Sequence, residues 1–279
     1  MNKIVVATDF SENSKKGVLF SIQLALQMDC ELIFFNAVQI FRPSIWDNVY
    51  YGQFEINEVA RNQTVLETFI EAIFLKNNVS KINYSCVCEV GVSASSGTID
   101  YATKIKASYI CASTTGVGRI MKIFGTTASE LIAFSPIPVF IVPKNYRIKP
   151  LKSIFFASDF KNFTEELRHI QKFSIPVKAD IEVYHYDYQV HLDVGANKFQ
   201  RIARNNKSES LKFHYKKLDD TKSIISHVEK DIRKSKLSLI VLFTKQNQNW
   251  FNRLFLSSLS AELSFDTKKP MLIFKKHLI

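Results

Sequence analysis

The chain has 279 residues, of which 46% are hydrophobic and 23% charged, and its formal net charge is +11. This composition provides enough apolar surface for folding throughout, which excludes an intrinsically disordered protein, and the length favours two domains. No apolar run reaches the roughly 20 residues of a membrane-spanning helix, and residues 4–7 are too short a run for a signal peptide, so we expect a cytoplasmic protein without membrane insertion.

In the first 144 residues, short apolar runs alternate with longer segments of helical period, which is typical of a parallel sheet covered on both faces. The predicted strands are 3–8, 31–38, 82–89, 108–112 and 138–142. The predicted helices are 12–28, 56–77, 95–106 and 126–134. Ser11 and either Thr126 or Thr127 suit the N-cap positions of the first and last of these helices.

A long aromatic stretch, residues 41–54, follows the second predicted strand. Loops of this length at the carboxyl end of a strand often form lids or binding surfaces. Trp46, Tyr50 and Tyr51 suit a ligand cover or a subunit contact, but packing against the helices of the same domain is the simpler expectation.

The second half of the chain repeats the first. Residues 154–161 (IFFASDFK) align with residues 4–11 (IVVATDFS), and the closing runs 138–143 and 270–275 also correspond. The predicted second-half strands are 152–157, 180–185, 212–216, 238–243 and 271–275. The predicted second-half helices are 163–173, 195–207, 221–235 and 256–265.

Two domains follow from this repeat, residues 1–144 and residues 151–279, joined by so short a basic linker that they should pack closely. With right-handed crossovers, each is an α/β domain with an open, doubly wound, Rossmann-like sheet of five parallel strands. The ligand crevice of such a sheet lies at the carboxyl ends of its strands, where Asp9, Val38 and the loop after 108–112 fall.

The positive charge is concentrated in the second half. Residues 1–150 contain 14 Lys and Arg against 12 Asp and Glu, so their net charge is 14 − 12 = +2. Residues 151–279 contain 23 Lys and Arg against 14 Asp and Glu, so their net charge is 23 − 14 = +9. A nucleic acid or an anionic surface would be attracted to such a charge. The cations are nevertheless scattered over helix ends and loops, so we expect a solvated surface and no nucleic-acid partner. Examples are Lys212, Lys216, Lys217, Arg233, Lys234 and Lys236.

The four cysteines lie in or beside apolar runs, without a CxxC motif or a metal-type spacing to histidine. Because cysteine is among the residues most often buried, we predict buried free thiols and neither a disulfide framework nor a metal site. The four are Cys30, Cys86, Cys88 and Cys111.

The segment 111–127 (CASTTGVGRIMKIFGTT) follows a buried strand and leads into a helix. Its three glycines allow close approach of backbone N–H groups to an anion, and a helix N-terminus adds partial positive charge. Thr126, Thr127, Arg119 and Lys122 offer further donors to phosphate. A glycine loop by itself is equally compatible with a simple turn.

Together with Asp9 and the closing residues 136–139, this loop makes the whole chain resemble the universal stress protein family. ATP-binding members of that family carry Gly, two residues, Gly, nine residues, Gly and then Ser or Thr. Here Ser113 stands at the first glycine and Gly116 at the second. Gly125 and Thr126 form the last pair, after eight intervening residues.

The resemblance implies an adenine-nucleotide alpha hydrolase-like fold that binds ATP, with Mg²⁺, in the first domain. Asp9 would lie at the ribose or adenine side, backbone groups near Val38 would contact adenine, and the glycine loop would hold the phosphates. The implied nucleotide-binding residues are Thr8, Asp9, Val38, Ser113, Gly116, Gly118, Gly125, Thr126 and Thr127. For Asp9, a purely local strand-end hydrogen bond remains an equal alternative.

In the second half, the corresponding segment 244–258 has no glycine, so we predict that this site is vestigial. All six histidines lie in the second half and form no catalytic constellation, so we expect no enzyme, or at most very slow ATP hydrolysis. The favoured function is a stress-response regulator that binds ATP or a related nucleotide in its first domain.

An alternative function is a ligand-free interaction scaffold with both sites degenerate, which Ser113 and the shortened loop favour. The resemblance also implies an intramolecular pseudo-dimer of the two domains through their closing strands. A protein partner or a homodimer is left open.

Overall fold

The computed structural model describes residues 1–41, 48–114, 125–187, 194–218, 224–245 and 268–276. The first-half elements are β1 (Asn2–Ala7), α1 (Ser14–Ala25), β2 (Cys30–Val38), α2 (Asn48–Lys76), β3 (Tyr84–Val90), α3 (Ala94–Lys104), β4 (Tyr109–Ser113), α4 (Gly125–Phe134) and β5 (Val139–Val142). The second-half elements are β6 (Ser153–Ala157), α5 (Phe163–Val177), β7 (Asp180–Asp187), α6 (Val194–Asn205), β8 (Leu211–Lys217), α7 (Ile224–Lys234), β9 (Leu239–Lys245) and β10 (Met271–Lys276).

The predicted strands are confirmed to within two residues at either end. The apolar runs located them well because a strand buried on both faces needs a continuous apolar sequence. The predicted helix at 256–265 lies outside the described residues.

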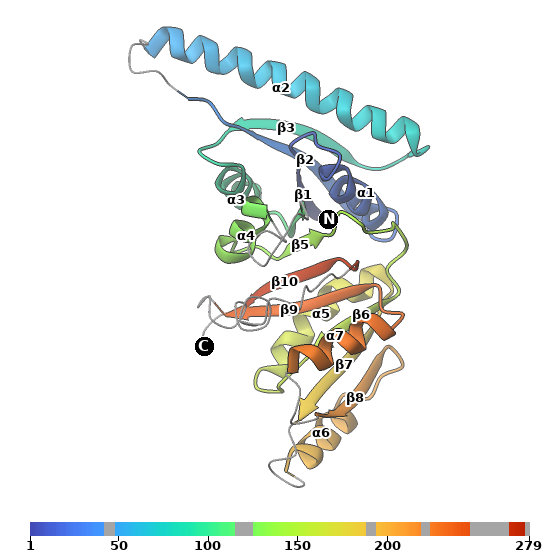
Figure 1. Cartoon of the computed structure of the whole chain (residues 1–279). Coiled ribbons are helices and arrows are strands. Elements are labelled where there is room, and N and C mark those ends of the chain that lie inside the picture. The colour runs from blue at the N-terminus through green and yellow to red at the C-terminus, as the bar shows by residue number, and fades with distance from the viewer. Residues whose placement is uncertain (42–47, 115–124, 188–193, 219–223, 246–267, 277–279) are drawn as a thin grey trace.

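The ten strands form one sheet with the order β3-β2-β1-β4-β5-β10-β9-β6-β7-β8 (Figure 1). Each half has the same internal order, and its strands are parallel, as predicted. The two five-stranded sheets are joined by the antiparallel pair β5–β10, in which Phe140 lies opposite Leu272. This pairing satisfies N–H and C=O groups that two separate sheets would leave at open edges.

Helices cover both faces of the sheet. One core cluster includes residues of α1, α2 and α5 and runs through both halves, and the other includes residues of α3, α4 and α7. Phe173 of α5 contacts the rings of Phe140 and Tyr109 in the first half, with centroids 5.3 and 5.7 Å away. The close packing expected from the short linker is therefore present.

The linker itself is held by a side chain of the first half. Gln27 Nε2 donates to the Leu151 carbonyl oxygen (3.0 Å), and the Leu151 N–H donates to Gln27 Oε1 (2.8 Å). A single glutamine thus satisfies both backbone groups of the residue that leads into β6.

Three predicted helix starts need correction. The helix α1 begins at Ser14, and Ser11 instead accepts the Ser14 N–H across the preceding turn (3.2 Å). The helix α4 begins at Gly125, so Thr126 and Thr127 lie in its first turn and not at the N-cap.

The third correction concerns the aromatic stretch. The helix α2 begins at Asn48, eight residues before its predicted start, because the segment 48–55 continues the helical pattern without a glycine or proline cluster that would end it. Tyr50 and Tyr51 are therefore helical, and Tyr50 is exposed, contrary to the expectation of burial. Trp46 lies outside the described residues.

The cysteines are free, and three of them, Cys30, Cys88 and Cys111, are buried, whereas Cys86 is half-buried. Burial raises the thiol pKa of Cys86 to about 12 and that of Cys88 to about 11. The described helices include none that is long and apolar enough to cross a membrane.

Candidate functional site

The four residues after β1 form a turn that hydrogen bonds from its own side chains stabilise. Thr8 Oγ1 accepts the Phe10 N–H (3.2 Å), and Asp9 Oδ1 accepts the Ser11 N–H (3.1 Å). Phe10 adopts a left-handed conformation with φ of 63°. Short polar side chains that bond backbone groups two residues ahead stabilise such turns.

The second half repeats this turn. Ser158 Oγ accepts the Phe160 N–H (3.1 Å), Asp159 Oδ1 accepts the Lys161 N–H (3.0 Å), and Phe160 has a φ of 60°. The local hydrogen bond considered for Asp9 is therefore present. It is a property of the repeat and carries no information on ligand binding.

Above this turn, the first half contains a cavity of about 510 Å³. It lies at the carboxyl ends of β1, β2 and β4, where β1 is flanked by β2 on one side and β4 on the other, which is the topological switch point of the sheet. Its size falls within the range of small-molecule sites. Of the predicted site residues, the cavity is lined by Thr8, Asp9, Val38, Ser113, Thr126 and Thr127.

Ser113 does not obstruct this cavity with its hydroxyl group. The Gly17 N–H of α1 donates to Ser113 Oγ (2.7 Å), so the side chain is directed at the helix. A Cβ at position 17 would lie 2.8 Å from Ser113 Oγ, too close for an unshifted contact. Gly17 and Ser113 are therefore a complementary pair.

Two other predicted residues are engaged in local structure. Thr8 is buried, and its Oγ1 donates to Ser14 Oγ (2.9 Å). Val38 is buried, and its carbonyl oxygen accepts the Gly91 N–H (3.0 Å). Of the other predicted residues that line the cavity, Asp9 is exposed, and Thr126 and Thr127 lie in the first turn of α4.

Gly125 is the first residue of α4 and places that helix N-terminus beside the cavity. The N–H groups of a first helical turn have no partners within the helix and attract anions. Gly116 and Gly118, like Arg119 and Lys122, lie outside the described residues.

The cavity also involves residues that the sequence analysis did not select. Asn36 Nδ2 donates to the Thr8 carbonyl oxygen (2.8 Å), and Glu58 and Asn62 reach the cavity from α2. Asn36 could have been found from the predicted strand end. Glu58 and Asn62 could not, because only the crossing of α2 over the sheet brings them there.

The helix α3, which lines the cavity through Ala94 and Thr98, packs very closely on β2. A Cβ on Gly97 would lie 2.8 Å from Ala37 Cβ, and one on Gly91 would lie 3.2 Å from it. The helix α3 begins with a capping box in which Ser93 and Ser96 exchange hydrogen bonds, and Ser95 of its first turn donates to Glu130 of α4. These contacts fix α3 and α4 together beside the cavity.

Aromatic rings contact one another at the equivalent strand ends of the second half. His185 occupies the position of Asn36, and its Nδ1 lies 2.9 Å from the Ser158 carbonyl oxygen, which requires a proton on Nδ1. Its ring stacks on Phe160 with centroids 4.4 Å apart, and Phe199 and Tyr215 also contact it. A hollow of about 790 Å³ in this half begins at Phe160 and lies between the start of α5 and the end of α6.

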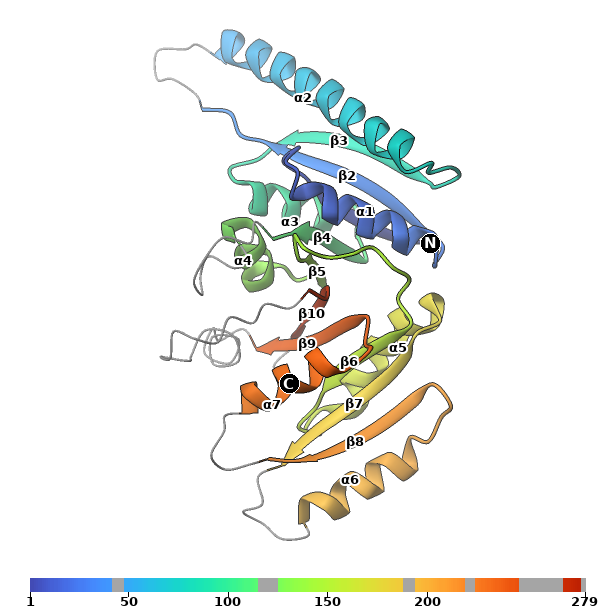
Figure 2. The same ribbon diagram turned by 45° about the vertical axis from the view of Figure 1, so that its right-hand side comes forward.

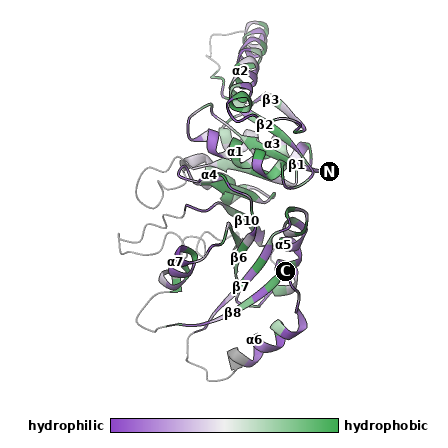
Figure 3. Cartoon of the chain, turned by 90° about the vertical axis from the view of Figure 1, so that its right-hand side faces the viewer, coloured by the Kyte–Doolittle hydropathy of each residue, from purple (hydrophilic) through white to green (hydrophobic). Residues whose placement is uncertain are grey.

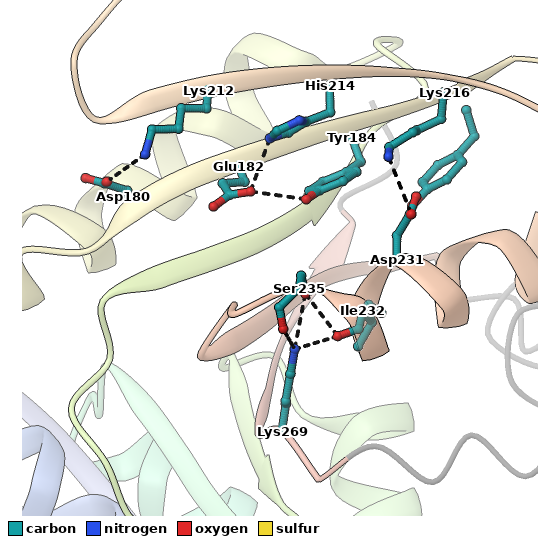
Figure 4. A network of polar contacts seen from close by, with 11 residues as sticks. Asp180, Glu182, Tyr184, Lys212, His214, Lys216, Asp231, Ile232, Ser235 and Lys269 are labelled. Carbon is teal, nitrogen blue, oxygen red and sulfur yellow. Dashed lines mark hydrogen bonds and ion pairs between the residues drawn. The ribbon is translucent and has the colours of Figure 1, made fainter.

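Three side chains of β8 lie close to acidic residues on one face of the sheet (Figure 4). Lys212 of β8 pairs with Asp180 of β7 (3.4 Å), and Lys216 pairs with Asp231 of α7 (3.4 Å). His214 Nε2 lies 3.1 Å from Glu182.

Lys269, just before β10, is likewise used internally. Its Nζ donates to the carbonyl oxygen of Ser235 (2.8 Å) and to Ser235 Oγ (3.1 Å) at the end of α7 (Figure 4). Burial lowers the pKa of this ammonium group. A cation at a helix C-terminus stabilises its unpaired carbonyl groups.

Comparisons with known proteins agree with this architecture. The family model described as the universal stress protein family matches residues 1–143. A universal stress protein from Archaeoglobus fulgidus DSM 4304 has a similar structure, with a TM-score of 0.68 and 15% identity over 99% of this chain and 96% of that one.

Two further solved structures are similar in fold. A functionally unknown protein from Pseudomonas aeruginosa PAO1 has a TM-score of 0.54 and 14% identity over 99% of this chain and 92% of that one. A putative universal stress protein from Pseudomonas aeruginosa UCBPP-PA14 has a TM-score of 0.53 and 12% identity over 99% and 93%. No curated protein matches the sequence.

Proposed function

The chain belongs to the universal stress protein family, and from this premise we propose that it is a regulator that binds ATP or a related nucleotide in its first half. The observation that carries the proposal is the cavity of about 510 Å³ at the switch point of the first five strands. Nucleotides bind at this place in open α/β sheets because the strand ends and helix N-termini converge there.

The described lining suits the chemistry of a nucleotide. Asp9 is an exposed carboxylate that can accept hydrogen bonds from ribose hydroxyls, and Thr126 and Thr127 can donate to phosphate oxygens beside the α4 N-terminus. Asp9 and Glu58 are the carboxylates among the described lining residues and would be the groups to hold Mg²⁺. Mg²⁺ would neutralise phosphate charge there.

We further propose that the site binds without catalysing a rapid reaction. The described lining includes neither histidine nor cysteine, and Ser113 is directed at Gly17. Histidine is the most frequent general base, and cysteine is a common nucleophile. The second half is proposed to be vestigial because the rings of His185 and Phe160 occupy its strand ends.

The experiment exploits the difference between the halves. Asn36→His places in the first half the imidazole that His185 provides in the second, and the second half demonstrates that the fold accepts it. The added ring should occupy the cavity next to Phe10. Titration calorimetry with ATP and Mg²⁺ should give about one site per chain, with affinity lowered at least tenfold in Asn36→His.

The matched control is His185→Asn, which should leave the affinity unchanged. Binding that His185→Asn abolishes would place the nucleotide in the second half and overturn the assignment. Absence of binding to the unaltered protein at millimolar nucleotide would favour the second candidate function, a ligand-free interaction scaffold. That candidate draws support from Thr8 and Ser113, whose hydroxyl groups are already used within the protein.

A further inference from the structure

The outer face of α6 consists of cationic and amide side chains. Figures 1 and 2 show α6 at the end of the molecule farthest from the first half, and its colouring in Figure 3 is mainly hydrophilic. Between residues 197 and 205, every exposed side chain carries N–H donors, and none is a carboxylate. These side chains are Asn197, Lys198, Gln200, Arg201, Arg204 and Asn205. Such a face attracts anions.

The packing of α6 does not require the positive charge of this face. Phe199 of α6 and Phe69 of α2 pack on the equivalent phenylalanines of the two repeated turns, with ring centroids 6.0 and 5.9 Å apart. Arg201 therefore corresponds to Glu71, since each follows that phenylalanine by two residues. Because the first half has a carboxylate at this position, the shared fold does not explain the guanidinium group of Arg201.

The cations of α6 also differ from those of β8. Lys212 and Lys216 of β8 each lie 3.4 Å from a carboxylate oxygen. Among the described residues, Lys198, Arg201 and Arg204 have no ion-pair partner. Their charges are therefore free to interact with an anion from solution.

Arg201 lines the hollow of about 790 Å³ between the start of α5 and the end of α6. Lys161 lines the same hollow from the α5 side, together with the polar side chains of Asn162, Thr164 and Asn205. The volume falls within the range of small-molecule sites. The hollow thus brings together cations from two separate segments, with amide and hydroxyl donors between them.

Two carboxylates at or beside the hollow decide which cation contributes most. Glu165, which lines it, has its Oε1 atom 3.9 Å from Arg168 Nη2 on the same helix. Asp159 Oδ2 lies 4.0 Å from Lys161 Nζ. Arg201 is therefore the lining cation for which an anion meets the least competition, and Lys161 contributes less.

The chemistry of the hollow favours a small phosphorylated molecule over a nucleic acid. A guanidinium group matches the geometry of phosphate oxygens and can bind two of them at once. Proteins that bind single-stranded nucleic acids add aromatic rings on which the bases stack. The rings that line this hollow belong to Phe160 and Phe163, which are both buried, so they offer no such platform.

We propose that the hollow between α5 and α6 binds a phosphate-bearing small molecule, with Arg201 as the principal contact and Lys161 as the second. This site lies in the second half and is separate from the cavity at the strand ends of the first half. It does not depend on the function proposed above.

Titration calorimetry of the full chain with pyrophosphate tests the proposal. Arg201→Gln should lower the affinity about tenfold, because a charge-assisted hydrogen bond to the anion is lost. Lys161→Gln should lower the affinity by a smaller factor, because Asp159 shares that cation. Absence of heat at millimolar pyrophosphate would overturn the proposal.

The matched control is Arg204→Gln. It removes the same charge from the outer face of the same helix, but Arg204 is not among the residues that line the hollow. It should leave the affinity within about twofold of the parent, because exposed charges outside a site act through screened long-range attraction only. An equal loss in Arg204→Gln and Arg201→Gln would show diffuse attraction to a cationic protein and would contradict a defined site.

A second control separates this site from the cavity of the first half. Asn36→His alters that cavity and should leave the Arg201-dependent binding of pyrophosphate unchanged. Pyrophosphate binding that Asn36→His abolishes and Arg201→Gln does not affect would place the anion in the first half and overturn the proposal. A protein that binds pyrophosphate through Arg201 but binds no ATP would contradict only the function proposed above.

Discussion

At the scale of single residues, Ser113 stands where the sequence analysis expects a glycine in ATP-binding members of the family. Ser113 carries a side chain, and Gly17 on the neighbouring helix lacks one, so the hydroxyl group fits against the helix and accepts its N–H. The sequence analysis noted only that Ser113 stands where the first glycine of the family motif is expected. In the structure its hydroxyl group accepts the Gly17 N–H.

The first prediction concerns this pair. Gly17→Ala should lower the free energy of unfolding by about 1–2 kcal/mol, because the new Cβ displaces Ser113 Oγ and leaves a part-buried N–H unpaired. Ser113→Ala should cost about 1 kcal/mol by removing the same acceptor. Urea denaturation of both single variants and the double variant measures the coupling.

The two substitutions remove one shared hydrogen bond. The free energy of unfolding of the double variant should therefore fall by less than the sum of the two single decreases, with a difference of about 1 kcal/mol. Strict additivity would mean that Gly17 and Ser113 do not interact in solution.

At the scale of elements, α3 can lie close to β2 because the residues at their contact have little or no side chain. Gly97 of α3 and Ala37 of β2 approach so closely that a single added Cβ would overlap, and both elements line the cavity through Ala94, Thr98 and Ala37. The helical pattern of residues 95–106 predicted α3 but could not predict how near it lies to the strand.

The second prediction follows. Gly97→Ala should destabilise the protein by about 1–3 kcal/mol, although alanine favours a helix by about 1 kcal/mol over glycine. The rigid Cβ of Ala37 cannot move aside as a long side chain would. Thermal unfolding is the measurement, and the double variant Gly97→Ala with Ala37→Gly should regain most of the loss. A Gly97→Ala protein more stable than the parent would show that the contact is looser.

At the scale of the whole molecule, the two halves share one sheet and both core clusters. The antiparallel pair β5–β10 joins the sheets, and Phe173 joins the cores by packing on Phe140 and Tyr109. Elements that share a core generally unfold together. We therefore expect a single cooperative transition.

The third prediction tests this coupling. Trp46 and Trp250 are the two tryptophans, one in each half, so single-tryptophan variants report on the halves separately. Their denaturation curves should coincide in the parent protein. Phe173→Ala should lower the free energy of unfolding by about 3–5 kcal/mol, because it leaves a cavity in the shared core. It should also separate the two denaturation curves.

The control for this prediction is Phe163→Ala on the same helix. Phe163 contacts the rings of Phe156, Phe160 and Phe213, all within the second half. Phe163→Ala should lower the free energy of unfolding by a similar amount. It should shift the denaturation curve of the second half more than that of the first half. Coincident curves in Phe173→Ala would show that the strand pair alone couples the halves.

Sequence by itself determined the repeat, the strands and the fold class, because each depends on local pattern or on residues a few positions apart. It placed Asp9, Val38 and the loop after residues 108–112 at one sheet edge through the topology of parallel strands. Tertiary structure alone decided that Ser113 is directed at Gly17, that Glu58 and Asn62 reach the cavity, and that His185 stacks on Phe160. These contacts join residues far apart in the chain, and their geometry depends on how closely whole elements pack, which no local pattern encodes.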